Sequence, residues 1–299
     1  MDEPHAGAGQ VRIRVSAVAV NPSDLGTRSG ATVALRRKVD PNFRVPDPPH
    51  VVGWDAVGVV DEAGTGVTDL AIGDRVVAVT NPHSGNGAYV ESLVVSAESA
   101  VLAPTNVDDT AACTLPMNGL TARLALDKLA LPTGATVAVT GGAGTLGGYV
   151  VQLAKADGLR VIADAAEADE ELVTSFGADV VVRRGPEVAR NILEAAPGGV
   201  DAVIDNAVQD DAVLAAVRDG GAIVTLRAHT GRTDRGITWY PIHVTEYVGE
   251  RTRLDQLARQ VEAGELMLRV ADTYSADRAA DAHRRLEDGG VRGRLVITF

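Results

Sequence analysis

The stretch Val137-Ala-Val-Thr-Gly-Gly-Ala-Gly-Thr-Leu-Gly-Gly-Tyr-Val-Val-Gln-Leu-Ala-Lys155 decides the fold of this chain. Its first four residues are mostly β-branched, which is typical of the end of a buried strand, and the residues from Tyr149 onward continue as a helix. Between them, Gly141, Gly144 and Gly147 recur at every third position. A strand, a glycine turn and a helix in this order suit a dinucleotide, because the backbone can approach a pyrophosphate and the helix start attracts its charge.

The spacing of these glycines is G-x-x-G-x-x-G, which differs from the dinucleotide fingerprint G-x-G-x-x-G. An ordinary turn between a strand and a helix in any α/β domain is therefore the alternative. The flanking strand and helix favour the cofactor interpretation. The sequence predicts that Gly141, Gly144, Thr145, Leu146 and Gly147 hold the cofactor phosphates.

The composition restricts the class of protein. A chain of 299 residues favours two domains, and 45% hydrophobic with 23% charged residues is typical of a globular protein. One cysteine, Cys113, excludes an internal disulfide and a cysteine-rich zinc lobe. The net charge of −12 argues against nucleic acid as a partner. We expect neither a membrane span nor a signal peptide, and hence a cytoplasmic location.

The pattern along the chain changes near Pro104. Before it, short alternating segments such as Val11–Val15 and glycine turns predict a β-rich domain. Within this part, residues 28–50 contain several basic residues and prolines and are expected to form a long irregular loop, either a solvated excursion or a substrate lid. After it, residues 109–131 are helical in period, and strands alternate with helices of ordinary length up to residue 253. This second pattern predicts an α/β fold with a doubly wound parallel sheet.

Short blocks along nearly the whole chain carry a family resemblance. They are Val20-Asn-Pro-Ser-Asp24, Gly53-Trp-Asp-Ala-Val-Gly-Val-Val60, Gly73-Asp-Arg-Val76, Gly87-Ala-Tyr-Val-Glu91, Asn118-Gly-Leu-Thr-Ala122, the glycine run, Phe176-Gly-Ala-Asp179, Val200-Asp-Ala-Val-Ile-Asp205, Ala282-His-Arg-Arg-Leu-Glu287 and Gly293-Arg-Leu-Val296. In these blocks the chain resembles the zinc-independent branch of the medium-chain dehydrogenase/reductase family, the quinone oxidoreductase-like proteins.

The resemblance implies a GroES-like β-rich domain over residues 1–117 and 264–299, split around a Rossmann domain over residues 118–263. It also implies the reduction of a quinone, an enone or another activated double bond with NAD(P)H. A small-molecule substrate and a homodimer paired through the edge of the Rossmann sheet belong to the same expectation. Relatives carry a β-hairpin before the segment equivalent to Val11–Val15, so either translation starts upstream of Met1 or the first domain is trimmed.

The zinc-dependent relatives place catalytic ligands at the positions of Asn21, Trp54 and Met117. None of these is a normal zinc ligand. The six histidines show no paired ligand spacing, and His283 is expected on a helix surface. The sequence therefore predicts no metal.

The choice between NADH and NADPH depends on residues after the second and third Rossmann strands. Asp164 or Glu167 could accept a hydrogen bond from a free ribose hydroxyl, which favours NADH. Arg184 stands where NADPH-using relatives carry a tyrosine, and its guanidinium could bind the 2′-phosphate. Arg183 and Arg184 could equally be surface charges. The resemblance favours NADPH, with NADH as the alternative.

The resemblance also places Asn118, Thr121 and the backbone after Asp205, at Asn206, near the nicotinamide. Asn118 could instead cap a helix, which is a common role of asparagine. Arg294 either lines the cofactor groove or only begins the last strand.

The proton donor is the least defined part of the site. Several relatives use a tyrosine at the position that Gly26 occupies here. The candidates left are Asn21 near the nicotinamide, Ser23 at a position where zinc-dependent relatives carry a relay hydroxyl, and Arg28 or Tyr89 for a developing enolate. Each of these could instead be structural. Two other functions stay open: redox-neutral or lyase chemistry on a specialised metabolite, and a non-catalytic NAD(P)H-binding sensor or scaffold.

Overall fold

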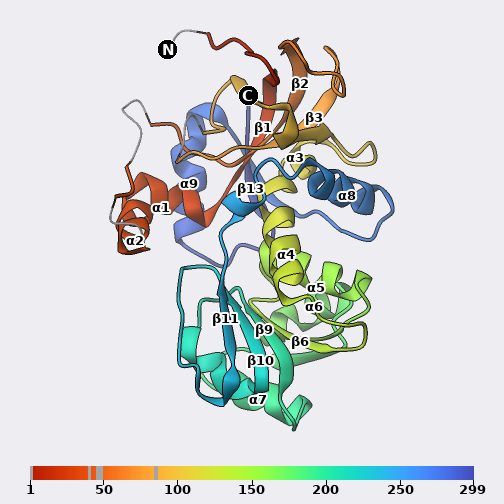
Figure 1. Cartoon of the computed structure of the whole chain (residues 1–299). Coiled ribbons are helices and arrows are strands. Elements are labelled where there is room, and N and C mark those ends of the chain that lie inside the picture. Colours follow the sequence, from red (N-terminus) through yellow and green to blue (C-terminus); the bar gives the residue numbers. More distant parts are fainter. Residues whose placement is uncertain (1–2, 40–41, 45–49, 84–86) are drawn as a thin grey trace. The chain divides into compact units, whose positions relative to one another are not determined.

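The computed structural model describes residues 3–39, 42–44, 50–83 and 87–299. The chain in Figure 1 divides into two compact units. Unit 1 contains Met1–Leu120, Tyr247–Gly264 and Leu268–Phe299, and unit 2 contains Thr121–Glu246 and Glu265–Met267. The domain boundaries expected from the sequence differ from this division chiefly by placing residues 247–263 with the Rossmann domain, and they stay a prediction.

Unit 1 is built on a seven-stranded sheet with the order β12-β13-β1-β2-β3-β5, in which β4 also pairs with β1. Apolar side chains alternate with more exposed ones at the start of β1, where Val11, Ile13 and Val15 are buried. The strand near the end of the chain, β13, pairs antiparallel with β1 and so completes this sheet. The strands are β1 (Gln10–Val20), β2 (Asp55–Ala63), β3 (Arg75–Val79), β4 (Ser92–Ser96), β5 (Ala100–Leu102), β12 (Val270–Ser275) and β13 (Arg294–Thr298).

The helices of unit 1 correct one expectation. The irregular loop expected over residues 28–50 is wrong for part of its length, because Ala31–Val39 forms helix α2. Alanine, leucine, arginine and lysine in this segment are strong helix formers. The proline-rich residues 45–49 lie outside the described residues. The other helices are α1 (Pro22–Arg28), α3 (Asp109–Ala112), α8 (Arg251–Glu262) and α9 (Ala279–Glu287).

Unit 2 contains a six-stranded sheet with the order β11-β10-β9-β6-β7-β8. Every neighbouring pair of strands is parallel. Counted along the chain, this is the order of the doubly wound dinucleotide-binding fold, in which the direction of winding reverses beside the first strand. The strands are β6 (Thr136–Thr140), β7 (Arg160–Ala165), β8 (Val180–Arg183), β9 (Val200–Asp205), β10 (Val217–Thr225) and β11 (Thr238–Pro241).

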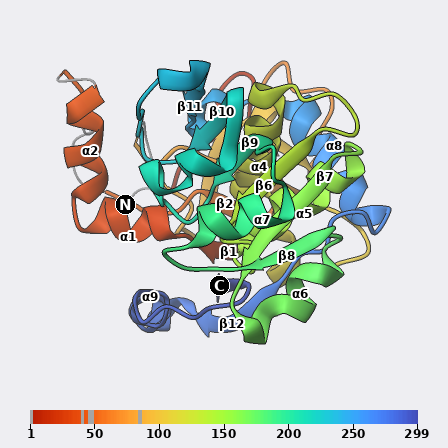
Figure 2. The ribbon, with the colours of Figure 1, turned by 90° about the horizontal axis from the view of Figure 1, so that it is seen from below.

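The connections in unit 2 confirm the expected helices only in part. Helices α5 (Thr145–Ala156), α6 (Glu170–Ser175) and α7 (Val188–Ala195) link the strands β6 to β9 (Figure 2). The expectation of ordinary helices is wrong for the last two links, which contain the 3-10 segments η3 (Asp210–Ala216) and η4 (Asp234–Gly236). Glycines at 231 and 236 disfavour a helix before β11. Helix α4 (Pro116–Leu129) contains the boundary between the two units.

Candidate active site and cofactor site

The glycine turn follows β6 in unit 2 and has a shape that requires glycine. Gly141 has a φ of +68°, in the left-handed region that favours glycine. A Cβ atom on Gly147 would lie 2.1 Å from the carbonyl oxygen of Gly141, so only hydrogen fits between helix α5 and the turn. Gly144 is the N-cap of α5. The first amides of a helix have no acceptor within it, so they are suited to an anion.

The carboxylate of Asp164 supports this turn from the neighbouring strand β7. Its Oδ1 accepts hydrogen bonds from the N–H groups of Gly141 and Gly142, at 2.6 and 3.3 Å. Burial raises the pKa of Asp164, and the two N–H groups partly offset this effect. Glu167, in contrast, is exposed and pairs with Arg183 at 3.0 Å. The acidic group that lies against the glycine turn is therefore Asp164.

The loop after β9 lies over the other side of the turn. Thr140 Oγ1 donates to Asp205 Oδ1 at 2.6 Å and accepts from the N–H of Ala207 at 3.0 Å. The other oxygen of Asp205 accepts from the N–H groups of two residues further along the loop, Gln209 and Asp210. Both side-chain amide atoms of Asn206 are buried and have no hydrogen-bond partner within the described part of the chain. Buried polar atoms of this kind are normally satisfied, so Asn206 fits a bound ligand.

Asn21 lies in unit 1 and is buried with no exposed surface. Its amide Nδ2 donates to Asp55 Oδ2 at 2.7 Å, and its Oδ1 accepts from Asn118 Nδ2 at 3.1 Å. Asn118 Oδ1 in turn accepts from the guanidinium of Arg294. Because arginine can only donate, the orientation of both asparagine amides is fixed. The hydrogen bonds of this series are all donated in one direction, from Arg294 towards Asp55. The amide of Asn21, predicted as catalytic, is thus engaged at both ends by protein groups.

Asp55 closes this chain at its acidic end. Its Oδ1 accepts from the N–H of Met117 at 2.5 Å. Burial raises the pKa of Asp55 to about 6, although the N–H of Met117 and the amide of Asn21 oppose the shift. This polar chain joins β13, α4, the start of α1 and β2 within unit 1. Its sequence signal is weak, because its members are far apart along the chain.

Zinc does not fit the residues of this region. The amide of Asn21 is already used, and the other two positions hold the indole of Trp54 and the thioether of Met117. Among the residues that the structure describes, no group of three or more His, Cys, Asp or Glu side chains could hold a metal ion.

The second polar cluster of unit 1 contains Tyr89, Asp24, His283 and Arg28. Tyr89 Oη lies 3.4 Å from Asp24 Oδ2 and 3.2 Å from His283 Nε2. Arg28 Nη1 lies 3.2 Å from His283 Nδ1. Burial raises the pKa of Asp24 to about 7, and the N–H of Asn21 partly opposes this shift. The structure therefore brings two predicted residues, Arg28 and Tyr89, together with two that the sequence interpretation missed.

The expected surface position of His283 is wrong, because the residue is 5% exposed. A signal for this was present in the sequence. Ala279, Ala282 and Leu286 pack against the core of unit 1, and His283 lies between them on helix α9. Helical spacing thus predicts a face on which His283 is at least partly buried.

Ser23 and Gly26 lie on helix α1. The hydroxyl oxygen of Ser23 is buried and has no hydrogen-bond partner among the described residues. A Cβ atom on Gly26 would lie 2.6 Å from Oγ1 of Thr32 in α2. A side chain at Gly26 would therefore fit only if the hydroxyl of Thr32 moved.

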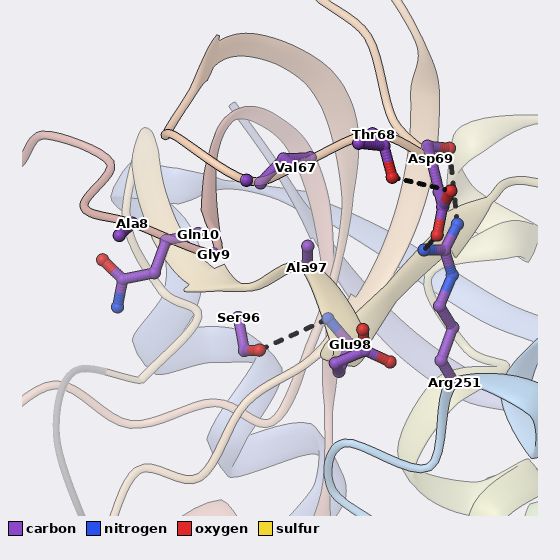
Figure 3. Close-up of a pocket in the computed structure, with 11 residues that line it drawn as sticks. Ala8, Gly9, Gln10, Val67, Thr68, Asp69, Ser96, Ala97, Glu98 and Arg251 are labelled. Carbon is purple, nitrogen blue, oxygen red and sulfur yellow. Dashed lines mark hydrogen bonds and ion pairs between the residues drawn. The ribbon is translucent and has the colours of Figure 1, made fainter.

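A surface pocket of about 490 Å³ lies elsewhere in unit 1 (Figure 3). None of the predicted site residues lines it. Two of its charged side chains, Arg251 and Asp69, form an ion pair with each other at 2.8 Å. The pocket therefore does not contribute to the candidate site.

The fold and the glycine turn define a Rossmann unit accompanied by a β-rich unit, and comparisons with known proteins agree. Residues 7–105 match the model of the alcohol dehydrogenase GroES-like domain, and residues 176–297 match that of the zinc-binding dehydrogenases. A 2-methylene-furan-3-one reductase of Solanum lycopersicum is 30% identical, over 98% of this chain and 73% of its own length. A chloroplastic NADPH-dependent alkenal/one oxidoreductase of Arabidopsis thaliana is 28% identical over the same shares, 98% and 73%.

A solved structure shows the same similarity. The quinone oxidoreductase from Coxiella burnetii superposes with a TM-score of 0.84 at 26% identity, over 100% of this chain and 93% of that one. The chain belongs to the medium-chain dehydrogenase/reductase family, in its quinone oxidoreductase-like branch, and it is an oxidoreductase. The predicted family and fold class are thereby confirmed.

Proposed function

We propose that this oxidoreductase reduces an activated carbon–carbon double bond or a quinone with NAD(P)H, and without zinc. The observation that carries the proposal is the turn in which Gly147 lies against Gly141, with the backbone of Asn206 beside Gly141 and the amide of Asn206 without a hydrogen-bond partner among the described residues. The relatives support the substrate class, since one is named a 2-methylene-furan-3-one reductase and another an NADPH-dependent alkenal/one oxidoreductase.

The residues of unit 2 bind and orient the cofactor in this proposal. The amides of Thr145, Leu146 and Gly147 at the start of α5 hold the pyrophosphate. Asn206 satisfies its amide on the nicotinamide side, as expected from the sequence. When bound, the reduced nicotinamide supplies the hydride, and the protein has to position it and to stabilise the charge that develops on the substrate oxygen.

Ser23 is the residue that we assign to the substrate oxygen in unit 1. Asn21 is engaged by Asp55 and Asn118, and Tyr89 and Arg28 are engaged by the cluster around His283. Of the four predicted catalytic residues, only Ser23 has a buried side-chain polar atom without a hydrogen-bond partner within the described ranges. A hydroxyl can both donate to an enolate oxygen and accept a proton in exchange.

We infer a preference for NADH from Asp164, although the family resemblance favours NADPH. The carboxylate of Asp164 is held against the glycine turn at the end of β7, where it can accept from the ribose hydroxyls and would repel a 2′-phosphate. Arg184 is exposed. Titration of both cofactors into Asp164→Ser and Arg184→Ala separates the two. We expect Asp164→Ser to weaken NADH binding about tenfold; a loss of NADPH binding in Arg184→Ala alone would reverse the assignment.

Oxidation of the reduced cofactor with a panel of quinones, enones and substituted acrylates tests the activity. We expect turnover by the wild type and none by Gly144→Val, because the valine would occupy the place of the pyrophosphate. Gly198→Ala is the matched control, since a Cβ atom there meets no other atom within 4 Å. Tight cofactor binding without any turnover would favour the non-catalytic sensor. Product formation without net cofactor oxidation would favour redox-neutral chemistry.

We also propose a homodimer paired through β11. This strand forms one edge of the parallel sheet of unit 2. Light scattering after gel filtration should give twice the chain mass of 31.0 kDa, and a monomer at micromolar concentration would contradict the proposal. No helix in the described ranges is long and apolar enough to cross a bilayer.

A further inference from the structure

Helix α1 is too short to be stable by itself, yet it carries Ser23 and begins at Asn21. It contains 7 residues, Pro22–Arg28, whereas isolated helices need about 12 to 15 residues to be even marginally stable in water. Its conformation and position therefore depend on contacts with other elements. Two of these contacts involve its first and last turns.

The contact at the first turn is made by Tyr89. Its hydroxyl donates to Asp24, the residue whose carboxylate also accepts from the backbone N–H of Asn21 at 2.8 Å and so caps the helix. The ring of Tyr89 lies close to the backbone of Gly53, where a Cβ atom would be 2.5 Å from the ring. Gly53 has a φ of +106° and provides the space for this ring.

The contact at the last turn is made by His283 of α9. Its Nδ1 lies 3.2 Å from Nη1 of Arg28, the last residue of α1, and its Nε2 lies 3.2 Å from Oη of Tyr89. The rings of Tyr89 and His283 meet edge to face, with centroids 5.7 Å apart. Arg28 also pairs with Glu287, one turn further along α9. We call Asp24, Arg28, Tyr89 and His283 the α1 clamp.

The hydrogens of the clamp can be assigned from its donors. Arginine only donates, so Nδ1 of His283 accepts and the proton of the neutral imidazole is on Nε2. This N–H donates to the oxygen of Tyr89, whose own hydrogen goes to Asp24. Burial, with the charge of Arg28, lowers the pKa of His283, which keeps the ring neutral. The clamp is therefore a closed ring that begins and ends on α1.

We propose that His283 and Tyr89 are positioning residues that hold α1, and with it Ser23, in the arrangement that the reaction requires. The assignment of Ser23 makes this inference rest on the proposed function. Neither residue touches the substrate in this scheme. Because the hydroxyl hydrogen of Tyr89 is given to Asp24, Tyr89 is not the proton donor to the substrate.

The clamp should open when His283 is protonated. A second proton would be placed on Nδ1, directly against the guanidinium of Arg28, where neither group can accept. The charged or titratable groups near the clamp are Arg28 and Glu287 at His283, and Asp55 and Arg294 at Asp24. Since the pKa of His283 is lowered from 6.5, the opening falls below pH 6.5.

Kinetics of four variants test the positioning role. His283→Phe and Tyr89→Phe keep an aromatic ring but lose the hydrogen bonds, and we expect kcat to fall about tenfold for each. The dissociation constant for NADH should not change, because the glycine turn lies in unit 2. His283→Gln retains a donor and an acceptor and should recover part of kcat, without the acidic limb of the pH profile. Arg284→Ala is the matched control, because this residue lies on α9 in an exposed ion pair with Asp281 and should keep the wild-type kcat.

Two measurements test the α1 clamp without an assay of catalytic turnover. Nitrogen-15 chemical shifts of His283 in the whole protein should report the neutral ring with its proton on Nε2. Hydrogen exchange of the α1 amides should be faster in His283→Phe than in the wild type and in Arg284→Ala. A proton on Nδ1, or unchanged α1 exchange, would overturn the clamp even if the wild type proved inactive. Faster exchange with an unchanged kcat in an active enzyme would overturn the positioning role alone. An inactive wild type would overturn the proposed function and the positioning role that rests on it, but not the clamp itself.

Discussion

The glycine turn of unit 2 is formed by backbone groups, whereas the polar clusters of unit 1 are formed mainly by side chains. The turn is made of backbone: Gly141 and Gly147 approach each other so closely that no side chain fits, and the amides at the start of α5 are the binding groups. In unit 1, the arrangement depends on side chains that lie far apart in the sequence, such as Asn21 with Asp55 and Asn118, or Tyr89 with His283.

We expect the two regions to respond differently to substitution. A backbone site depends on a few positions where any added atom collides, so a single change has a large and local effect. A side-chain network shares its stability among many partners, and removing one of them leaves others buried without an acceptor or donor. The four predictions below test this contrast, beginning with the largest effect.

Gly147→Val should have the largest effect, since the new Cβ atom would lie 2.1 Å from the carbonyl oxygen of Gly141. The turn has to move, and we expect NADH affinity to fall at least about 100-fold together with a loss of about 3 kcal/mol in unfolding free energy. Fluorescence titration and urea denaturation measure both. Gly198→Ala, in open space of the same unit, should behave as the wild type. Normal affinity in Gly147→Val would break the contrast between the two regions.

Asp55→Ala tests the side-chain network. It leaves the amide of Asn21 and the N–H of Met117 buried without their acceptor, and we expect the unfolding free energy to fall by about 3 kcal/mol. NADH affinity should change little, because the turn does not depend on this residue. Asp55→Asn retains one acceptor oxygen and should cost less. A loss of cofactor binding equal to that of Gly147→Val would show that the two regions are not independent.

Asp24 gives a dependence of stability on pH. Its pKa is raised from 3.8 to about 7 in the folded state, so the folded protein binds a proton that the unfolded chain has released. The stability from this group is fully present below about pH 4 and is lost as the pH rises through 7. Asp24→Asn should therefore gain stability relative to the wild type between pH 4 and pH 7, by up to about 1.4 kcal/mol per pH unit.

Urea denaturation of wild type and Asp24→Asn at several pH values measures this difference. Asp288→Asn is the control, because Asp288 is exposed at the end of α9. A constant difference between Asp24→Asn and the wild type at all pH values would show that Asp24 is not protonated in the fold.

Arg183→Ala should have the smallest effect. Its partner Glu167 is 83% exposed, and exposed ion pairs contribute about 0.5 kcal/mol or less. Unfolding free energy and affinity for both cofactors should stay within that limit of the wild type. A clear loss of NADPH binding would instead assign the phosphate contact to Arg183, the neighbour of Arg184, and would sharpen the boundary of the cofactor site.

Part of the site was predictable because its chemistry is local. The glycine spacing, the β-branched strand before it and the helix after it all lie within residues 137–155, and their order reports a turn without any knowledge of distant contacts. The alternation over Val11–Val15 predicted β1 for the same reason, and helical spacing along α9 could have placed His283 near the core. The helix over Ala31–Val39 was missed because neighbouring prolines and charges suggested a loop.

The sequence by itself determined the two architectures, their order along the chain and the turn beside β6, because strand and helix periods and glycine sterics act between near neighbours. Only the tertiary structure decided which polar groups are engaged. In the folded protein Asn21 is hydrogen-bonded to Asp55 and Asn118, and His283 is buried against Tyr89. The hydroxyl of Ser23 has no partner among the described residues. The physical reason is that hydrogen bonds of buried side chains are satisfied across distances in sequence that no local pattern records.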